Sequence, residues 1–210
     1  MTLESILLVG AGGHAKSCID VIEQEGRFNI IGLVGKESEV GNSIFGYPVL
    51  GSDADLPALL NKSSNALITI GQIKTSEPRI RLFKLLQQYG FSLPTVISPK
   101  AYVSNHAAVG IGTIILHGAI LNAGAVVGDN CIINSQALVE HDAVVNEHSH
   151  ISTGAIINGT ANIGLGTFIG SGSLVREGIN VGEHSVIGMG QKVVTDCDAR
   201  TQVPQIKVAL

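Results

Sequence analysis

The chain has 210 residues and a formal net charge of −4, and its composition already excludes several classes of protein. Only 14% of the residues are charged, which is too few for a disordered chain or a set of long solvated helices. The charge offers no basic surface for nucleic acid, and no apolar run reaches the roughly 20 residues that cross a bilayer. With 26 glycines and no tryptophan, the composition favours a repetitive β architecture with a core of small aliphatic side chains.

The cysteines and the N-terminus indicate the compartment. Cys18, Cys131 and Cys197 are scattered and lack the spacing of a metal or redox motif. The first residues have no basic leader and are typical of a folded strand and turn, which argues against a signal peptide. We therefore expect a cytoplasmic protein with reduced cysteines.

Residues 1–95 alternate strand-like and helix-like segments, which predicts a small Rossmann-like α/β domain with a parallel sheet. Short apolar runs at residues 5–9, 30–34 and 66–70 are the expected strands. In chain order, the expected helices are one that buries Ala15, Cys18, Ile19 and Ile22, a short one capped by Asp53 and ending at Leu60, and one over residues 78–89 that ends at Gly90.

From Val103 to Ile187 an aliphatic residue recurs at every sixth position without a gap. A small residue follows four positions after nearly every one of them, with Ile179 as the exception. A period of six fits neither an α-helix nor a hairpin sheet and indicates a parallel β-helix. We predict a left-handed β-helix of hexapeptide repeats over residues 96–210, in which three repeats form one coil of a triangular prism. No insertion interrupts the repeats, so an active site must use the coil surface and the N-terminal domain.

The residues directly before the inward aliphatic residues should point outward from the coils. Several of them are apolar, and an apolar outer surface on such a fold requires a partner. Because the expected partner is another copy of the chain, we predict a closed homotrimer rather than a monomer with an apolar side. These outward residues are Ile114, Ile120, Val126, Ile132, Leu138, Val144 and Ile156.

The loop after the first strand contains Gly10, Gly12 and Gly13, directly before His14. Gly10 permits a tight turn, and the next two glycines let a ligand approach the backbone, where free N–H groups of the helix can bind an anion. Gly71 ends the third strand at the same edge of the sheet, where such sheets bind ligands. We therefore expect the acceptor substrate at this edge.

Two motifs carry a resemblance to a known family. One is the segment GAGGHAK at residues 10–16, and the other is Glu140-His141-Asp142, followed by EHSHIS at residues 147–152. With an α/β domain leading into a β-helix, the chain resembles the NeuD/PglD-type sugar acyltransferases over nearly its whole length. That family contains sialic acid O-acetyltransferases and N-acetyltransferases of nucleotide-linked 4-amino sugars. The resemblance implies an acetyl-CoA-dependent sugar acetyltransferase of surface polysaccharide or glycan synthesis, without a resident metal.

The resemblance implies that His141 is the catalytic base and that Asp142 is its acidic partner. In the family this base takes a proton from the acceptor amine or hydroxyl, which attacks the thioester of acetyl-CoA. The chemistry is independently reasonable, because imidazole titrates near neutrality and a carboxylate can fix its tautomer. His141 lies two places after an inward residue and should therefore be accessible. The alternative interpretation is a surface histidine at a trimer interface.

Further roles follow from matching positions in the family. His150 matches a histidine that contacts acetyl-CoA, Gly159 leaves room for the pantetheine arm, and Ser171 lies at another coenzyme contact. Asn134 and His14 match residues that face the acceptor. Three of these residues also have a plain structural interpretation: an interface contact for His150, a turn residue for Asn134 and a helix start for His14. Ser171 matches the family by location rather than by residue type. His148 has no counterpart in the family, and a structural role is expected for it.

Two segments depart from the family. The amino-sugar N-acetyltransferases usually have an acidic pair where this chain has Gly35 and Lys36, and the lysine is closer to the sialic acid branch. At the C-terminus only Pro204 and Lys207 match the family's closing segment over the adenine of coenzyme A. The acceptor sugar, its linkage to a nucleotide, O- or N-acetylation and the mode of adenine binding stay open on the sequence.

Two alternative functions follow from the same residues. Histidines 117, 141, 148 and 150 invite comparison with γ-class carbonic anhydrases, which are trimeric β-helices with zinc at the subunit boundary. That class lacks an N-terminal α/β domain, however, and the histidine spacing here follows the acyltransferases. The second alternative is a trimer that binds sugar nucleotides without catalysis, against which the His141–Asp142 pair argues.

Overall fold

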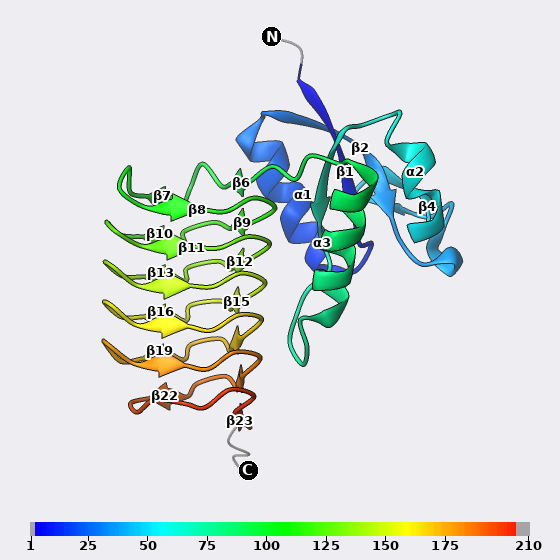
Figure 1. Ribbon diagram of the computed structural model, residues 1–210. Coiled ribbons are helices and arrows are strands. Elements are labelled where there is room, and N and C mark those ends of the chain that lie inside the picture. The colour runs from blue at the N-terminus through cyan, green and yellow to red at the C-terminus, as the bar shows by residue number, and fades with distance from the viewer. Residues whose placement is uncertain (1–2, 205–210) are drawn as a thin grey trace, which may run out of the picture.

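The computed structural model describes residues 3–204, in which a small α/β domain lies beside a three-sided prism (Figure 1). The N-terminal sheet has the strand order β3-β4-β2-β1-β5. Its elements are β1 (Glu4–Val9), α1 (Gly13–Glu25), β2 (Phe28–Val34), a 3₁₀-helix (Glu37–Glu39), β3 (Ser43–Ile44), β4 (Tyr47–Gly51), a 3₁₀-helix (Asp53–Asp55), α2 (Leu56–Leu59), β5 (Asn65–Ile68) and α3 (Glu77–Tyr89).

The sheet is mixed rather than purely parallel, which corrects one expectation. β1, β2, β4 and β5 run parallel, but the two-residue strand β3 forms an antiparallel hairpin with β4. The cap of the short helix was also assigned wrongly to Asp53. Ser52 precedes the helical turn, and its backbone N–H donates to Asp55 Oδ2 at 2.8 Å. Two adjacent polar residues before the turn left the cap ambiguous in the sequence.

Helix α1 forms as its pattern predicted. Ala15, Cys18, Ile19 and Ile22 are all fully buried. The helix ends at Gly26, which has a left-handed φ of 69° and donates its N–H to the Ile22 carbonyl. The apolar stripe therefore fixes which side of α1 faces the sheet.

The prism consists of three parallel sheets of two-residue strands, five to seven strands in each. We call the sheet β6-β9-β12-β15-β18-β21-β23 the docked face, the sheet β7-β10-β13-β16-β19-β22 the second face, and the sheet β8-β11-β14-β17-β20 the third face. The strands are β6 (Val96–Ile97), β7 (Tyr102–Val103), β8 (Ala108–Val109), β9 (Ile114–Ile115), β10 (Ile120–Leu121), β11 (Val126–Val127), β12 (Ile132–Ile133), β13 (Leu138–Val139), β14 (Val144–Val145), β15 (His150–Ile151), β16 (Ile156–Ile157), β17 (Asn162–Ile163), β18 (Phe168–Ile169), β19 (Leu174–Val175), β20 (Asn180–Val181), β21 (Val186–Ile187), β22 (Lys192–Val193) and β23 (Gln202–Val203).

The register confirms the predicted coil. Ile133 pairs with Ile151, eighteen residues later, and the same offset holds between neighbouring strands from β6 to β22. The second residue of nearly every strand points into the prism. The repeat is one unit longer at each end than the sequence pattern indicated, because Ile97 and Val193 also pack against the interior.

The corners require a left-handed backbone at every sixth residue. Positive φ values recur from Gly112 to Gly190, and this regular demand explains much of the glycine content. Six corner positions hold other residues, and three of them (Asn130, Asp142 and His148) have side-chain contacts described below. These residues are Asn130, Gln136, Asp142, His148, Thr160 and His184.

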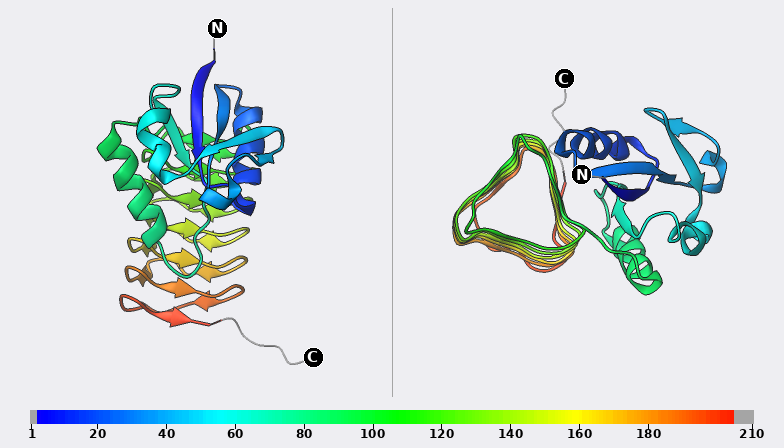
Figure 2. Two further views of the ribbon diagram at one scale, coloured as in Figure 1. Left: turned by 90° about the vertical axis from the view of Figure 1, so that its right-hand side faces the viewer. Right: turned by 90° about the horizontal axis from the view of Figure 1, so that it is seen from above.

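The N-terminal domain covers the docked face. In Figure 2 it lies along one side of the triangle, and the corner between the second and third faces is on the far side. Ile114 and Ile132 are fully buried in one cluster with Cys18 and Ile22 of α1. For these two residues the expected partner was wrong, because the chain's own domain covers them. Ile120, on the second face, is 39% exposed.

Candidate active site

The predicted site residues lie in three places. His141, Asp142 and Gly159 are at the corner between the second and third faces. His14, Gly71, Asn134, His150 and Ser171 line a cavity between the two domains. Gly10 and Gly12 line another cavity within the N-terminal domain, and Gly13 begins α1 between the two cavities.

His141 and Asp142 form a solvent-exposed pair. Nδ1 of His141 lies 3.0 Å from Asp142 Oδ2, and the side chains are 62% and 65% exposed. Because an ionised carboxylate can only accept, Nδ1 carries the proton and Nε2 is left free to accept another. Asp142 has a φ of 58°, a conformation that Asp tolerates better than most residues.

Two glycines make room for this pair. A Cβ at Gly159 would lie 2.7 Å from both Cε1 and Nε2 of His141. A Cβ at Gly124, in the coil before, would overlap the Asp142 carboxylate. Gly159 was expected to leave room for pantetheine, and in this chain its missing side chain leaves room for the His141 ring.

The cavity between the domains has a volume of about 330 Å³, and we call it the interdomain pocket. One wall is the carboxyl end of β5 with α1, and the other is the docked face. It brings His14 and His150 together, with ring centroids 6.4 Å apart, although the two lie far apart in the sequence. Sequence reasoning missed Gln72 and Phe168 in its lining. The position of Gln72 directly after Gly71 was the only signal for it.

His150 is held as one neutral tautomer. Its Nδ1–H donates to the Gln72 carbonyl at 2.6 Å, and its Nε2 accepts from Asn134 Nδ2 at 3.2 Å. Burial lowers the pKa of His150 to about 4. The ring also meets the edge of Phe168, with centroids 5.2 Å apart. His150 is therefore a fixed, uncharged group at neutral pH and is not suited to take up a proton.

His14 is also neutral. Burial, followed by the charge of Arg79 and then by His150, lowers the pKa of His14 to about 3. Its Nε2 is buried and has no hydrogen-bond partner among the described residues. Gly71 lies against it, because a Cβ there would be 3.7 Å from the Cβ of His14.

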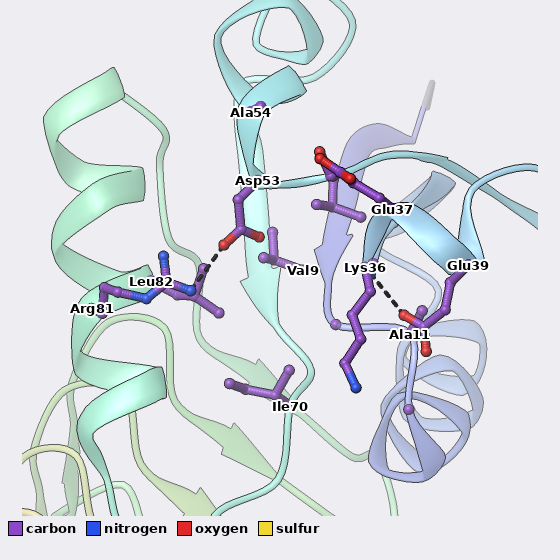
Figure 3. Close-up of a pocket in the computed structure, with 15 residues that line it drawn as sticks. Val9, Ala11, Lys36, Glu37, Glu39, Asp53, Ala54, Ile70, Arg81 and Leu82 are labelled. Atoms are coloured by element: carbon purple, nitrogen blue, oxygen red, sulfur yellow. Dashed lines mark hydrogen bonds and ion pairs between the residues drawn. The ribbon is translucent and has the colours of Figure 1, made fainter.

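The second cavity, the glycine-loop pocket, has a volume of about 570 Å³ (Figure 3). It opens at the carboxyl ends of β1 and β2, where Gly10 adopts a φ of 127° and has no space for a side chain. Lys36 points into it from one side, and Arg81 reaches Asp53 at 2.9 Å on the other. Asp53 and Arg81 were not predicted as site residues, because only folding brings α3 over this edge.

Neither His141 nor Asp142 lines the interdomain pocket or the glycine-loop pocket. The pair lies at the corner opposite the docked face, so one chain does not bring His141 to His14 and His150. The interdomain pocket and the corner are therefore two separate parts of the predicted site.

The histidines of the zinc alternative are not gathered within one chain. His148 Nδ1 accepts a hydrogen bond from Asn130 Nδ2 (2.9 Å), and its ring packs on Phe83. His117 Nε2 lies 2.7 Å from Asp20 Oδ2. No group of three or more His, Cys, Asp or Glu within residues 3–204 is arranged to hold a metal ion. His148 thus has the structural role that was expected.

Two other predictions concern the chain ends and the membrane. Lys207 lies outside the described residues, whereas the Pro204 carbonyl accepts from Gln191 Nε2 at 3.3 Å. Over residues 3–204, no helix combines the length and the apolar character that a membrane span needs.

Comparison with known proteins shows similarity to acetyltransferases over nearly the whole chain and to a known family over the N-terminal domain. Residues 5–83 match the family model of the PglD N-terminal domain. The acetyltransferase domain of PglB from Neisseria gonorrhoeae is 29% identical with a TM-score of 0.87, over 96% of this chain and 97% of that one. A second structure of that domain contains acetyl coenzyme A. No curated protein sequence matches significantly.

A further match is perosamine N-acetyltransferase from Caulobacter crescentus in complex with CoA and GDP-perosamine. It is 28% identical with a TM-score of 0.91, over 99% of this chain and 97% of that one. In that structure and one other, a histidine is replaced by Asn or Ala. The left-handed β-helix and the α/β domain are thereby confirmed. Residues 5–83 match the PglD N-terminal domain, and the whole chain has the hexapeptide repeats and the domain order of the acetyltransferases to which it is similar.

Proposed function

We propose that the protein transfers the acetyl group of acetyl-CoA to the amino group of a nucleotide-linked sugar. The observation that carries this proposal is the pairing of two adjoining cavities with an exposed His–Asp pair, on a chain whose structure matches an N-acetyltransferase in complex with CoA and GDP-perosamine. Free sialic acid and O-acetylation are the competing acceptor and reaction.

The two cavities suit the two ends of such an acceptor. The glycine-loop pocket is large enough for a nucleoside and lies at the sheet edge where α/β domains bind nucleotides. The diphosphate would lie at the start of α1, where Gly12 leaves the helix without a side-chain cap and no acidic residue occupies the first turn. The sugar would then reach the interdomain pocket at His14.

His141 is the base in this proposal. Its Nδ1–H is held by Asp142, so Nε2 is the atom that accepts a proton. The amine attacks the thioester carbonyl carbon and its proton passes to Nε2, after which the C–S bond breaks and the coenzyme A thiolate takes up a proton. His150, with both ring nitrogens already hydrogen-bonded, is a fixed wall beside the coenzyme, and Asn134 faces the acceptor.

The site is completed by a second copy of the chain, and we propose a homotrimer. In one chain the corner with His141 is far from the interdomain pocket. The second face presents Ile120, Leu138 and Ile156 along its length, partly exposed, next to this corner. Packing of that face against a neighbour buries these residues and places His141 beside the neighbour's interdomain pocket.

The main test is acetyl transfer from acetyl-CoA against GDP-perosamine, UDP- and dTDP-linked amino sugars, free sialic acid and its CMP conjugate. We expect a nucleotide-linked amino sugar to give the highest kcat/KM. Preferred acetylation of free sialic acid would instead assign the protein to the O-acetylating branch. Stoichiometric zinc, with loss of activity on chelation, would overturn acetyl transfer by His141 in favour of a zinc hydratase.

Mixed trimers test where the site is formed. His141→Ala and His150→Ala variants, each inactive, are denatured together and refolded. If each site combines His141 of one chain with His150 of another, random mixing restores about a quarter of the wild-type activity, since each site needs two intact contributions. A site formed within one chain would give no recovery. Each variant refolded alone is the control.

A further inference from the structure

Arg79 is a buried cation without a carboxylate partner. Its side chain is 1% exposed, and no Asp or Glu among residues 3–204 lies within ion-pair distance of it. Burial lowers the pKa of Arg79 to about 10, so the guanidinium still carries its charge at neutral pH. Removing a charge from water is unfavourable, so the burial of this guanidinium indicates a role other than stabilising the fold.

The guanidinium joins the two domains through neutral oxygen atoms. Nη1 donates to the carbonyls of Ile68 and Ile70, at 3.1 and 2.8 Å, at the carboxyl end of β5. Nη2 donates to the backbone carbonyl and to Oδ1 of Asn130, at 3.1 and 2.7 Å, on a corner of the prism. Asn130 Nδ2 in turn contacts the Arg79 carbonyl and His148, so the corner is held from both sides.

These contacts lie behind the interdomain pocket. The segment that follows β5 carries Gly71 and Gln72, and the Gln72 carbonyl accepts the hydrogen bond from His150 Nδ1. Gly71 and Gln72 belong to the wall formed by the N-terminal domain, and His150 belongs to the wall formed by the coils. Arg79 therefore joins the backbone behind the N-terminal wall of the pocket to a corner of the coils that form the other wall.

We propose that Arg79 is a positioning residue for acetyl transfer. It fixes the wall of the interdomain pocket that the N-terminal domain forms, which would hold the acceptor, relative to the wall that the coils form, which would hold the coenzyme. This inference rests on the proposed function. The planar guanidinium suits the task, because its rigid fork reaches four oxygen atoms on two domains, whereas a lysine ammonium has three donors on a flexible stem.

The proposal predicts a specific kinetic signature. Each substrate is held mainly by its own wall, so a looser joint leaves both KM values nearly unchanged and lowers kcat, which depends on alignment. Arg79→Lys keeps the charge and loses the fork. We expect its kcat to fall about tenfold or more, with KM for acetyl-CoA and for the best acceptor of the panel within about twofold. Lys84→Met, which removes an exposed cation from the same helix, is the matched control and should behave as wild type.

A second variant protects the test against misfolding. Asn130→Gly suits the left-handed backbone at φ 52° and removes only the side-chain contacts to Arg79 and His148. It should lower kcat in the same way and to a smaller extent. The positioning role is wrong if kcat is unchanged in both variants, if only KM rises, or if both variants unfold. In each of these cases acetyl transfer by the wild type would still support the proposed function. Absence of transfer by the wild type on the whole panel would instead refute the proposed function.

Discussion

The docked face and the second face are built from the same repeat, but the N-terminal domain covers only the docked face. Ile132 on the docked face is fully buried, whereas Ile120 on the second face is 39% exposed. Both directly precede an inward aliphatic residue, and their chain positions are equivalent within the hexapeptide. The repeat therefore determines which residue points outward, and only the packing of the two domains determines whether that residue is covered.

The comparison also separates the parts of the proposed site. Further along the docked face, the outward residues change from isoleucine to His150 and Phe168, and there the interdomain pocket opens. The second face has apolar outward residues from β10 to β19, and it borders the corner that carries His141. One face thus provides a pocket and the other provides a reactive group with an apolar surface beside it.

The largest effect is expected at the corner pair. His141→Ala should lower kcat by about 100-fold or more, because general-base catalysis contributes 10²–10⁴-fold. Acetyl-CoA binding by calorimetry and the oligomeric state by light scattering should stay as in the wild type. Transfer at the wild-type rate would remove His141 from the mechanism and with it the functional contrast between the two faces.

Stability should distinguish the faces themselves. Ile132→Ala leaves a cavity between the domains and should cost about 2–5 kcal/mol, whereas Ile120→Ala should cost less than about 1 kcal/mol within a single chain. Urea denaturation at a protein concentration that gives monomers measures both. To test the trimer, Ile120→Glu should keep the fold and dissociate the oligomer. If the two alanine variants lost the same free energy of unfolding, the difference in burial between Ile132 and Ile120 would be contradicted.

His150, which is buried on the docked face, makes the stability of the chain depend on pH. Burial lowers the pKa of His150 to about 4 in the folded chain, while the unfolded chain titrates near 6.5. The unfolded state therefore binds protons first, and stability is complete above pH 6.5 and is lost as the pH falls towards 4.

Between pH 7 and pH 5, His150 alone should lower the free energy of unfolding by about 2 kcal/mol per chain. His150→Asn should remove this share of the dependence and leave the share of His14, and replacement of the exposed His106 by Asn should leave the dependence unchanged. Denaturation curves at several pH values provide the measurement, and an unaltered slope in His150→Asn would refute the assignment.

A smaller effect is expected at Gly159. A Cβ there would lie 2.7 Å from the His141 ring, and the backbone of Gly159 is outside the left-handed region, so alanine adds only the clash. Gly159→Ala should lower kcat roughly tenfold through displacement of the ring, with little change in the melting temperature. A crystal structure of the variant with the ring unmoved, or an unchanged kcat, would contradict this explanation.

Much of the prism was predictable because its determinants are local. An aliphatic residue at every sixth position specifies the interior, and the recurrent glycines match the left-handed corners. His141 and Asp142 are adjacent in the chain, so their pairing also followed from the sequence. The limits of the repeat were less clear, since Ile97 and Val193 lie where the flanking pattern fades.

The arrangement of the two domains determined the parts of the candidate site that the sequence did not predict. His14 and His150 meet only because α1 and β5 pack on the docked face, and Arg79 of α3 is buried in the same contact. The separation of the glycine-loop pocket from the interdomain pocket has the same origin. A periodic sequence specifies contacts between neighbouring coils at a constant offset, but contacts between domains have no constant offset, and for this reason only the tertiary structure determined them.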